Sequence, residues 1–171
     1  MRAFIGIRPQ DCLDDLVFVQ QELQAQTKAN YTAKDNIHLT LFFLGEISDQ
    51  EIEKIKDLFR KFSFDGFLLE IDAITNFREM IIAKTKKNFQ LDWLHKKLKD
   101  GLANQGFLME NRPYFAHITL ARNIDVLYSK PVSLFTKVKS IILYSSERDD
   151  SGLRYRPLAV CNLHEKRRED N

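Results

Sequence analysis

A four-residue pattern, His-x-Thr followed by a large apolar residue, occurs twice in this chain and restricts what the chain can fold into. The first copy is His38-Leu39-Thr40-Leu41, and the second, 79 residues later, is His117-Ile118-Thr119-Leu120. Each copy lies in an apolar run that is typical of a β-strand. Successive side chains of a strand point to opposite faces, so each His shares a face with its Thr. Two such strands brought together would present two imidazoles and two hydroxyls to one cleft.

Strand and helix patterns alternate along the rest of the chain. Ser48 and Glu51 form a sequence-level capping box, with Ile47 and Ile52 as the hydrophobic staple of a helix that starts there. The polar stretch 28–35 shows no period and predicts a loop. This alternation predicts an α+β, bilobal architecture with two antiparallel sheets flanking a central cleft. Apolar runs predict strands at 3–8, 36–44, 67–76, 79–86, 115–122, 132–145 and 153–163, and helical spacing predicts helices at 11–26, from 48 onward and around 91–102.

Composition excludes several classes of protein. The net charge of +2 gives no reason to expect a strongly basic surface for long nucleic acids, although a small phosphate ligand or the end of an RNA strand remains compatible. Cys12 and Cys161 are isolated thiols without metal-ligand spacing, which is typical of a reducing compartment. No apolar run is long enough to span a bilayer, and the N-terminal run is too short for a signal peptide. We therefore expect a cytoplasmic protein with no membrane association.

The chain resembles a known family at four places. These are the N-terminal strand Arg2–Ile7, the segment Asn36–Gly45 around the first motif, the segment Arg112–Arg122 around the second, and Arg154–Leu158. In this order they resemble the RNA 2',3'-cyclic phosphodiesterases of the 2H phosphoesterase superfamily, long called 2'-5' RNA ligases. The resemblance implies one domain over 1–171 with two pseudo-symmetric lobes, each an antiparallel sheet with helices outside. The charged residues 164–171 are expected to form a frayed tail.

The resemblance also implies a reaction, namely metal-independent hydrolysis of a terminal 2',3'-cyclic phosphate to a 2'-phosphomonoester, with reversible 2'-5' ligation in some members. The chemistry can be argued from the residues as well. Ring opening needs one proton taken from water and one given to the departing oxygen, and two imidazoles can hold opposite protonation states near neutral pH. Fixed hydroxyls such as those of Thr40 and Thr119 can stabilise the phosphoryl oxygens. By analogy with the family, His38 is the proton donor and His117 the proton acceptor.

Three further residues are candidates for substrate contacts. Arg122 matches a family arginine that binds phosphate, but strand alternation points it away from His117 and Thr119 unless the strand ends or bulges first. Phe42 lies on the same predicted face as His38 and Thr40, where an aromatic ring can stack on a nucleobase. Tyr114 is a second possible base or ribose contact. Simple packing is the competing explanation for Phe42.

Several alternatives remain open at the level of sequence. A related 2H phosphodiesterase acting on 2'-5' oligonucleotides or small cyclic nucleotides would use the same motifs, and so would a non-catalytic nucleotide-binding module. Neither motif carries the third ligand that a metal site needs, and no phosphate-binding glycine-rich loop is present, so we expect no metal and no cofactor. The expected partners are RNA ends or nucleotides with a 2',3'-cyclic phosphate, bound by a monomer.

Overall fold

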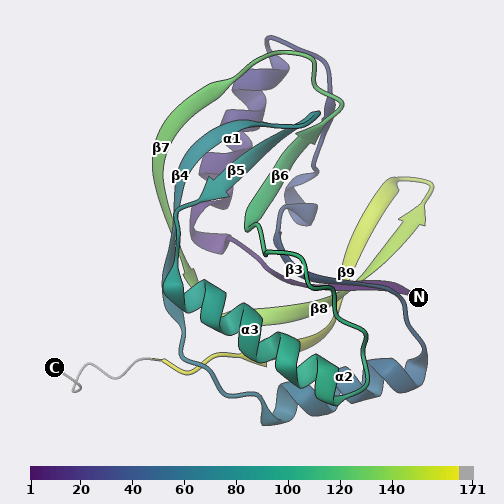
Figure 1. Ribbon diagram of the computed structural model, residues 1–171. Helices are drawn as coiled ribbons and strands as arrows, with labels where there is room; N and C mark the ends of the chain where they lie inside the picture. Colours follow the sequence, from purple (N-terminus) through teal and green to yellow (C-terminus); the bar gives the residue numbers. More distant parts are fainter. Residues whose placement is uncertain (166–171) are drawn as a thin grey trace, which may run out of the picture.

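The computed structural model describes residues 1–165 and shows two lobes that share one antiparallel sheet (Figure 1). The strand order is β7-β4-β5-β6-β3-β1-β8-β9, and the short β2 pairs with β6. In chain order the elements are β1 (Arg2–Ile7), η1 (Gln10–Cys12), α1 (Leu13–Gln24), β2 (Asn30–Tyr31), η2 (Lys34–Asn36), β3 (Leu39–Glu46), α2 (Asp49–Lys61), β4 (Phe67–Phe77), β5 (Met80–Thr85), α3 (Phe89–Asn104), β6 (His117–Arg122), β7 (Ser129–Val138), β8 (Ser140–Asp149) and β9 (Gly152–Asn162).

The two motif strands form the seam between the lobes. We call the half with β7, β4, β5, β6 and β2 the β6 lobe, and the half with β3, β1, β8 and β9 the β3 lobe. Only one residue pair, Leu39 and Ile118, joins β3 to β6. The predicted α+β class with two antiparallel halves is confirmed, and the halves are continuous through this single pair.

The lobes are interleaved along the chain rather than built from its two halves. Helix α1 packs on the β6 lobe, where the Gln20 side-chain amide donates to the carbonyls of Thr32 and Leu120 at 2.8 and 2.9 Å. Helices α2 and α3 instead cover the β3 lobe, beside β8 and β9 (Figure 1). Each lobe therefore depends on segments from both ends of the chain.

The predicted strand 132–145 is wrong as a single element. It is two strands that separate at Lys139, with β7 paired to β4 in one lobe and β8 paired to β1 in the other. Val138 and Ile141 are both fully buried on either side of the break. Because the apolar pattern continues across it, the sequence carries no sign that the chain changes lobes there.

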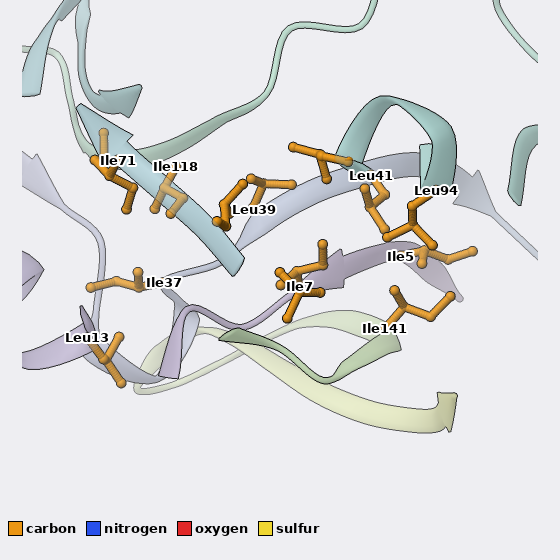
Figure 2. Close-up of a cluster of buried hydrophobic side chains, with 14 of the residues drawn as sticks. Ile5, Ile7, Leu13, Ile37, Leu39, Leu41, Ile71, Leu94, Ile118 and Ile141 are labelled. Carbon is orange, nitrogen blue, oxygen red and sulfur yellow. The ribbon is translucent and has the colours of Figure 1, made fainter. Parts of the chain in front are cut away.

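One core runs beneath both lobes and fixes the orientation of the motifs. Figure 2 shows it passing from Ile71 and Ile118 through Leu39 to Ile5 and Ile141. Leu39 and Ile118 are fully buried, and Leu41 and Leu120 are buried beside them. Burying such a side chain contributes roughly 1.5–3 kcal/mol. The apolar residues of both motifs are therefore committed to the core, which leaves His and Thr on the opposite face.

The structure bears on three local predictions, those for the start of α2, for residues 28–35 and for the C-terminal residues. The capping box of α2 is confirmed, since the Glu51 amide donates to Ser48 Oγ at 3.1 Å and the Ser48 amide donates to Glu51 Oε1 at 3.0 Å. The predicted loop 28–35 contains β2 and most of η2. His164 was placed in a frayed tail, but its amide donates to the Phe64 carbonyl and its Nε2 lies 2.7 Å from Ser63 Oγ. The rest of the predicted tail, from 166 onward, lies outside the described residues.

Within residues 1–165, the helices are all too short or too polar to cross a lipid bilayer.

Candidate active site

Both motifs line one pocket between the lobes. This interlobe pocket has a volume of about 560 Å³ and contains His38, Thr40, His117, Thr119 and Arg122. Residues from β2, β5, β8 and β9 complete it, and they were not singled out as candidates from the sequence. They include Asn30, Tyr31, Met80, Arg148, Leu153 and Tyr155. Of these only Tyr155 lies in a segment that resembles the family, Arg154–Leu158, and Leu153 directly precedes that segment.

A β-bulge in each motif strand decides which later residues face the pocket. In β6, Thr119 pairs with Ile82 and Ala121 pairs with the adjacent Ile81, so Leu120 is an extra residue. A bulge re-aims the side chains that follow it. The residue after Ala121 therefore turns back to the face of Thr119, and this brings Arg122 into the interlobe pocket.

The same irregularity occurs in β3 and corrects the prediction for Phe42. Thr40 pairs with Gly6 and Phe42 with the adjacent Ile5, which makes Leu41 the extra residue. Phe42 therefore leaves the face of His38 and Thr40, and Phe43 takes the position in the pocket, with 76% of its surface exposed. The prediction that Phe42 faces the cleft is wrong, and Phe43 is the aromatic residue that sequence reasoning missed.

Phe42 and Tyr114 belong to a packed aromatic stack outside the pocket. The His95 ring of α3 lies between them, with centroid distances of 4.3 Å to Phe42 and 3.9 Å to Tyr114. The Tyr114 hydroxyl donates to the backbone carbonyl of Thr40 at 2.7 Å. Tyr114 therefore does not line the pocket as a base contact. It ties the segment before β6 to the backbone of the first motif.

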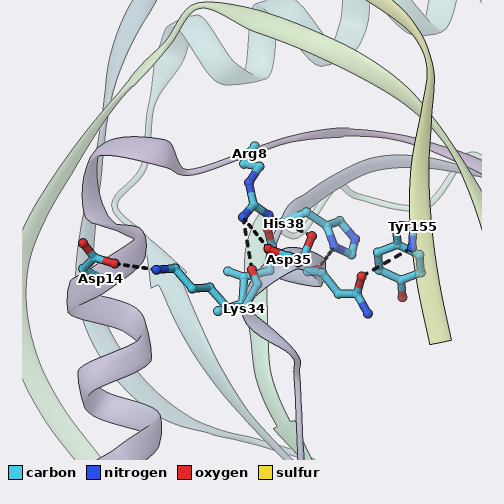
Figure 3. Close-up of polar contacts among 8 residues, drawn as sticks. Arg8, Asp14, Lys34, Asp35, His38 and Tyr155 are labelled. Carbon is cyan, nitrogen blue, oxygen red and sulfur yellow. Dashed lines mark hydrogen bonds and ion pairs between the residues drawn. The ribbon is translucent and has the colours of Figure 1, made fainter. Parts of the chain in front are cut away.

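His38 is held by the backbone two residues before it. Its Nδ1 lies 2.7 Å from the Asn36 carbonyl oxygen, which can only accept, so Nδ1 carries a proton and Nε2 faces Thr40 Oγ1 at 2.7 Å. The short helix η2, which supplies this carbonyl, is itself anchored, as Figure 3 shows. Arg8 donates to the carbonyls of Lys34 and Asp35 at 3.2 and 2.9 Å.

Asn36 and Gly6 complete the support of His38. The buried Asn36 amide donates to the Leu153 carbonyl of β9 at 2.9 Å, and its oxygen lies 3.4 Å from the Tyr155 amide. Gly6 lets β1 approach β3 closely: a Cβ there would lie 2.9 Å from the Leu39 carbonyl oxygen and 3.4 Å from His38 Cδ2.

His117 repeats the arrangement of His38 in the other lobe. Its Nδ1 lies 2.9 Å from the carbonyl oxygen of Phe115, again two residues earlier. Its ring stacks on Phe115 at a centroid distance of 4.9 Å. Thr119 and Arg122 both point at the weak acceptor Met80, with Arg122 Nη1 at 3.2 Å from the sulfur. Both motifs therefore keep Nδ1 occupied by the backbone.

Aromatic side chains enclose the His38 ring. His38 packs against Phe4 and Tyr155, with centroid distances of 4.6 and 5.2 Å. This burial lowers the pKa of His38 below its usual value, an effect that its bond to the Asn36 carbonyl opposes and that the nearby Arg122 reinforces. The lowered pKa favours the neutral form of His38 in the free site, and Nε2 of the neutral ring accepts a hydrogen bond from the Thr40 hydroxyl.

The arrangement provides proton-transfer groups and anion-binding groups, and no clustered metal ligands. Among residues 1–165, no three His, Cys, Asp or Glu side chains gather in a way that could hold a metal ion. Hydroxyls from both lobes and the Arg122 guanidinium converge on the same space as the imidazoles. Such a set of groups suits acid/base chemistry on a phosphate ester.

Comparisons with known proteins agree with this geometry. Residues 5–80 match the family model described as LigT like phosphoesterase. The RNA 2',3'-cyclic phosphodiesterase of Escherichia coli is 31% identical over 132 residues, which cover 74% of this chain and 75% of that protein. The enzyme of the same name from Thermotoga maritima is 27% identical, with 95% and 96% covered. The crystal structure of E. coli LigT complexed with 3'-AMP aligns with a TM-score of 0.83 at 27% identity, covering 95% of this chain and 97% of that one.

Proposed function

Because this chain belongs to the LigT-like phosphoesterases, the family of the RNA 2',3'-cyclic phosphodiesterases, we propose that His38 and His117 carry out its reaction. The protein is a cyclic phosphodiesterase, and thus a hydrolase. The substrate we propose is an RNA end with a 2',3'-cyclic phosphate, and the product is a 2'-phosphomonoester. The main support for this proposal is the convergence of both His-x-Thr motifs in one pocket.

The proposed step needs no group beyond the pocket. His117 Nε2 takes a proton from water as the water oxygen bonds to phosphorus. The bond from phosphorus to the 3' oxygen breaks, and His38 Nε2 gives that oxygen a proton. Each transfer typically contributes about 10²–10⁴-fold in rate. The Nδ1 bonds to Asn36 and Phe115 support these roles, because they orient both rings and leave each Nε2 for chemistry.

The donor role of His38 requires the substrate's charge. Burial lowers the pKa of His38 in the free protein, so its ring has to gain a proton when the substrate binds. An anionic phosphate close to Nε2 favours the charged imidazolium and raises this pKa. Thr40 Oγ1, freed from its bond to the neutral ring, can then turn its hydroxyl to a phosphoryl oxygen.

Thr119 and Arg122 are the proposed phosphate contacts from the other lobe. Their present partner is the sulfur of Met80, a weak acceptor, so exchanging it for a phosphate oxygen costs little. A guanidinium bond to an anion is stronger than a neutral hydrogen bond. With a 5'-hydroxyl RNA end in place of water, the same site would form a 2'-5' phosphodiester.

The product distinguishes this function from its alternatives. An oligoribonucleotide with a terminal 2',3'-cyclic phosphate is incubated with the protein and EDTA, and the new phosphate is assigned by ³¹P NMR. We expect a 2'-phosphate end. A 3'-phosphate end, or tight binding without any product, would contradict the proposal, the latter in favour of a nucleotide-binding module.

The direction of proton transfer needs a separate test. In a substrate whose 3' oxygen is replaced by sulfur, the departing group is a thiolate, which needs no proton because thiols have a pKa of about 8.5. His38→Ala should then recover most of its lost rate with the sulfur substrate, while His117→Ala should not. Recovery by His117→Ala alone would reverse the assignment.

The cellular setting is also proposed. Cys12 and Cys161 are both buried free thiols, and burial raises the pKa of Cys12 to about 11, which keeps it unreactive. Unpaired cysteines of this kind support a reducing, cytoplasmic location. Since the pocket is complete within one chain, we propose that a monomer acts on RNA ends without a metal.

A further inference from the structure

A second compartment adjoins the interlobe pocket. It has a volume of about 450 Å³ and shares part of its wall with that pocket. The shared residues are Phe43, Arg122, Arg148, Leu153 and Tyr155. Beyond them it is bounded by Arg2, Ala3 and Phe4 at the start of β1, by Gly45, and by Ser146 and Glu147 on β8. Apart from Arg122 of β6, its lining therefore belongs to the β3 lobe and to the β8–β9 turn region, and His117 is not part of it.

The charge of the second compartment suits a phosphodiester. Three arginines, Arg2, Arg122 and Arg148, face one carboxylate, that of Glu147. Glu147 is already paired with Arg156, whose Nε lies 3.2 Å from its Oε2. Over residues 1–165 none of the three arginines forms a salt bridge with an acidic side chain. Because Arg122 is the proposed contact of the reactive phosphate, Arg2 and Arg148 are the charges available for a second anion.

An exposed aromatic ring lies on the boundary between the two cavities. The bulge at Leu41 turns Phe43 outward from the sheet, and 76% of its surface is exposed. Most phenylalanines that serve only for packing are buried. A nucleobase can stack on such a ring, and stacking tolerates any base because every base has a π-face.

The covalent structure of the substrate indicates which group could occupy the second compartment. A terminal 2',3'-cyclic phosphate uses both of these ribose oxygens, so the RNA chain can continue only from the 5' oxygen. When the cyclic phosphate lies between His38 and His117, the preceding nucleotide must leave the interlobe pocket by an open side. The adjoining cavity with unpaired arginines is such an exit.

We propose that the second compartment binds the nucleotide preceding the cyclic end. Arg2 and Arg148 hold the phosphodiester that links the last two nucleotides, and Phe43 stacks on a base. The inference rests on the proposed function for its choice of ligand, and it makes oligonucleotides better substrates than cyclic mononucleotides.

The test compares a cyclic mononucleotide with a dinucleotide ending in the same cyclic nucleotide. For the unaltered protein we expect kcat/KM to be at least about tenfold higher for the dinucleotide, the gain expected from stacking one further base. Arg2→Gln should reduce this ratio severalfold, because Arg2 borders only the second compartment. Arg60→Gln, which removes an arginine from α2 outside both cavities, should leave the ratio unchanged. Equal kcat/KM values for the two substrates, or a loss with Arg2→Gln that is equal for both, would overturn the proposal.

Binding separates this inference from the proposed function. The affinities of His38→Ala for the same two compounds are measured by calorimetry, where no turnover is needed. Tighter binding of the dinucleotide supports the second compartment even if the unaltered protein proves inactive. Hydrolysis of both compounds without any preference in rate or binding would leave the proposed function intact and refute the second compartment.

Discussion

At the scale of single residues, the position of His38 depends on neighbours that do no chemistry. Asn36 supplies the carbonyl that fixes the ring, and its side chain fastens that carbonyl to β9. Gly6 provides the space, since β1 passes so close to Leu39 and His38 that a methyl group would collide with the backbone. The geometry of the imidazole is therefore set by the packing beneath it.

Gly6→Ala should lower kcat as well as the free energy of unfolding, whereas Gly66→Ala should lower only the free energy of unfolding. The added Cβ forces β1 and β3 apart beside His38, and overpacking of this kind typically costs about 1–3 kcal/mol. Gly66→Ala is a matched control, because its Cβ would also lie 2.9 Å from a backbone carbonyl oxygen, that of Val138. Urea unfolding and kcat are measured for both. Similar losses of stability with equal losses of kcat would show that the contact at His38 has no special importance.

Single residues also show where sequence reasoning stopped. The spacing of each motif correctly predicted that His and Thr share a face, because alternation holds within the tetrapeptides. It failed just after them, since the extra residues Leu41 and Leu120 reverse the alternation. Leucine is common in regular strands, so neither Leu41 nor Leu120 can be recognised as a bulge residue from the sequence. Phe42 was therefore placed on the face of His38 and Thr40. Arg122, a candidate phosphate contact, was expected to share the face of Thr119 only if the strand ended or bulged first, and the bulge at Leu120 meets that condition.

At the scale of elements, α3 and the segment before β6 clamp the first motif strand. His95 lies between Phe42 and Tyr114, and the Tyr114 hydroxyl bonds to the Thr40 carbonyl. This contact joins residues that are 74 positions apart and belong to the two motif regions. The clamp is thus a direct link between the parts of the chain that carry the two histidines.

Tyr114→Phe should lower the free energy of unfolding by roughly 1–3 kcal/mol, since the part-buried Thr40 carbonyl loses its partner. It should also lower kcat, because Thr40 and His38 share that stretch of backbone. Tyr128→Phe serves as the control, as the Tyr128 hydroxyl makes no hydrogen bond within residues 1–165. Urea unfolding and steady-state kinetics provide the comparison. Unchanged kcat in a destabilised Tyr114→Phe protein would limit the clamp to a structural role.

Most helices and strands could be predicted from the sequence, but the pairing of the strands in the sheet could not. Capping residues and apolar periods act locally, and they located α2 and α3 well. The pairing of strands depends on contacts between distant residues, so the change of lobe at Lys139 left no local sign. For the same reason the pocket residues from β5, β8 and β9 were missed.

At the scale of the whole molecule, the free energy of unfolding depends on pH through two histidines that pack near the seam between the lobes. Burial lowers the pKa of His38, and burial with a smaller contribution from Lys99 lowers the pKa of His95. Both rings lie close to β3. The folded protein therefore favours their neutral forms, whereas in the unfolded chain they titrate near pH 6.5.

Stability should fall as the pH is lowered below about 6.5. The unfolded chain then takes up protons that the folded protein resists, so unfolding becomes more favourable until the pH passes the lowered pKa values. Thermal unfolding at pH 7.5 and 5.5 measures this decrease in Tm. His95→Phe, which keeps an aromatic ring in the stack, should show a smaller decrease. An equal decrease in both proteins would exclude His95 as a contributor.

In the proposed mechanism, one histidine from each lobe takes part in a single proton-transfer reaction. The most direct test is the turnover number for an oligoribonucleotide ending in a 2',3'-cyclic phosphate, measured with EDTA for the unaltered protein, His38→Ala and His117→Ala. Each variant should lose at least about 10²–10⁴-fold in turnover while keeping its fold by circular dichroism. If either folded variant turned the substrate over at close to the unaltered rate, the two-histidine account would be contradicted.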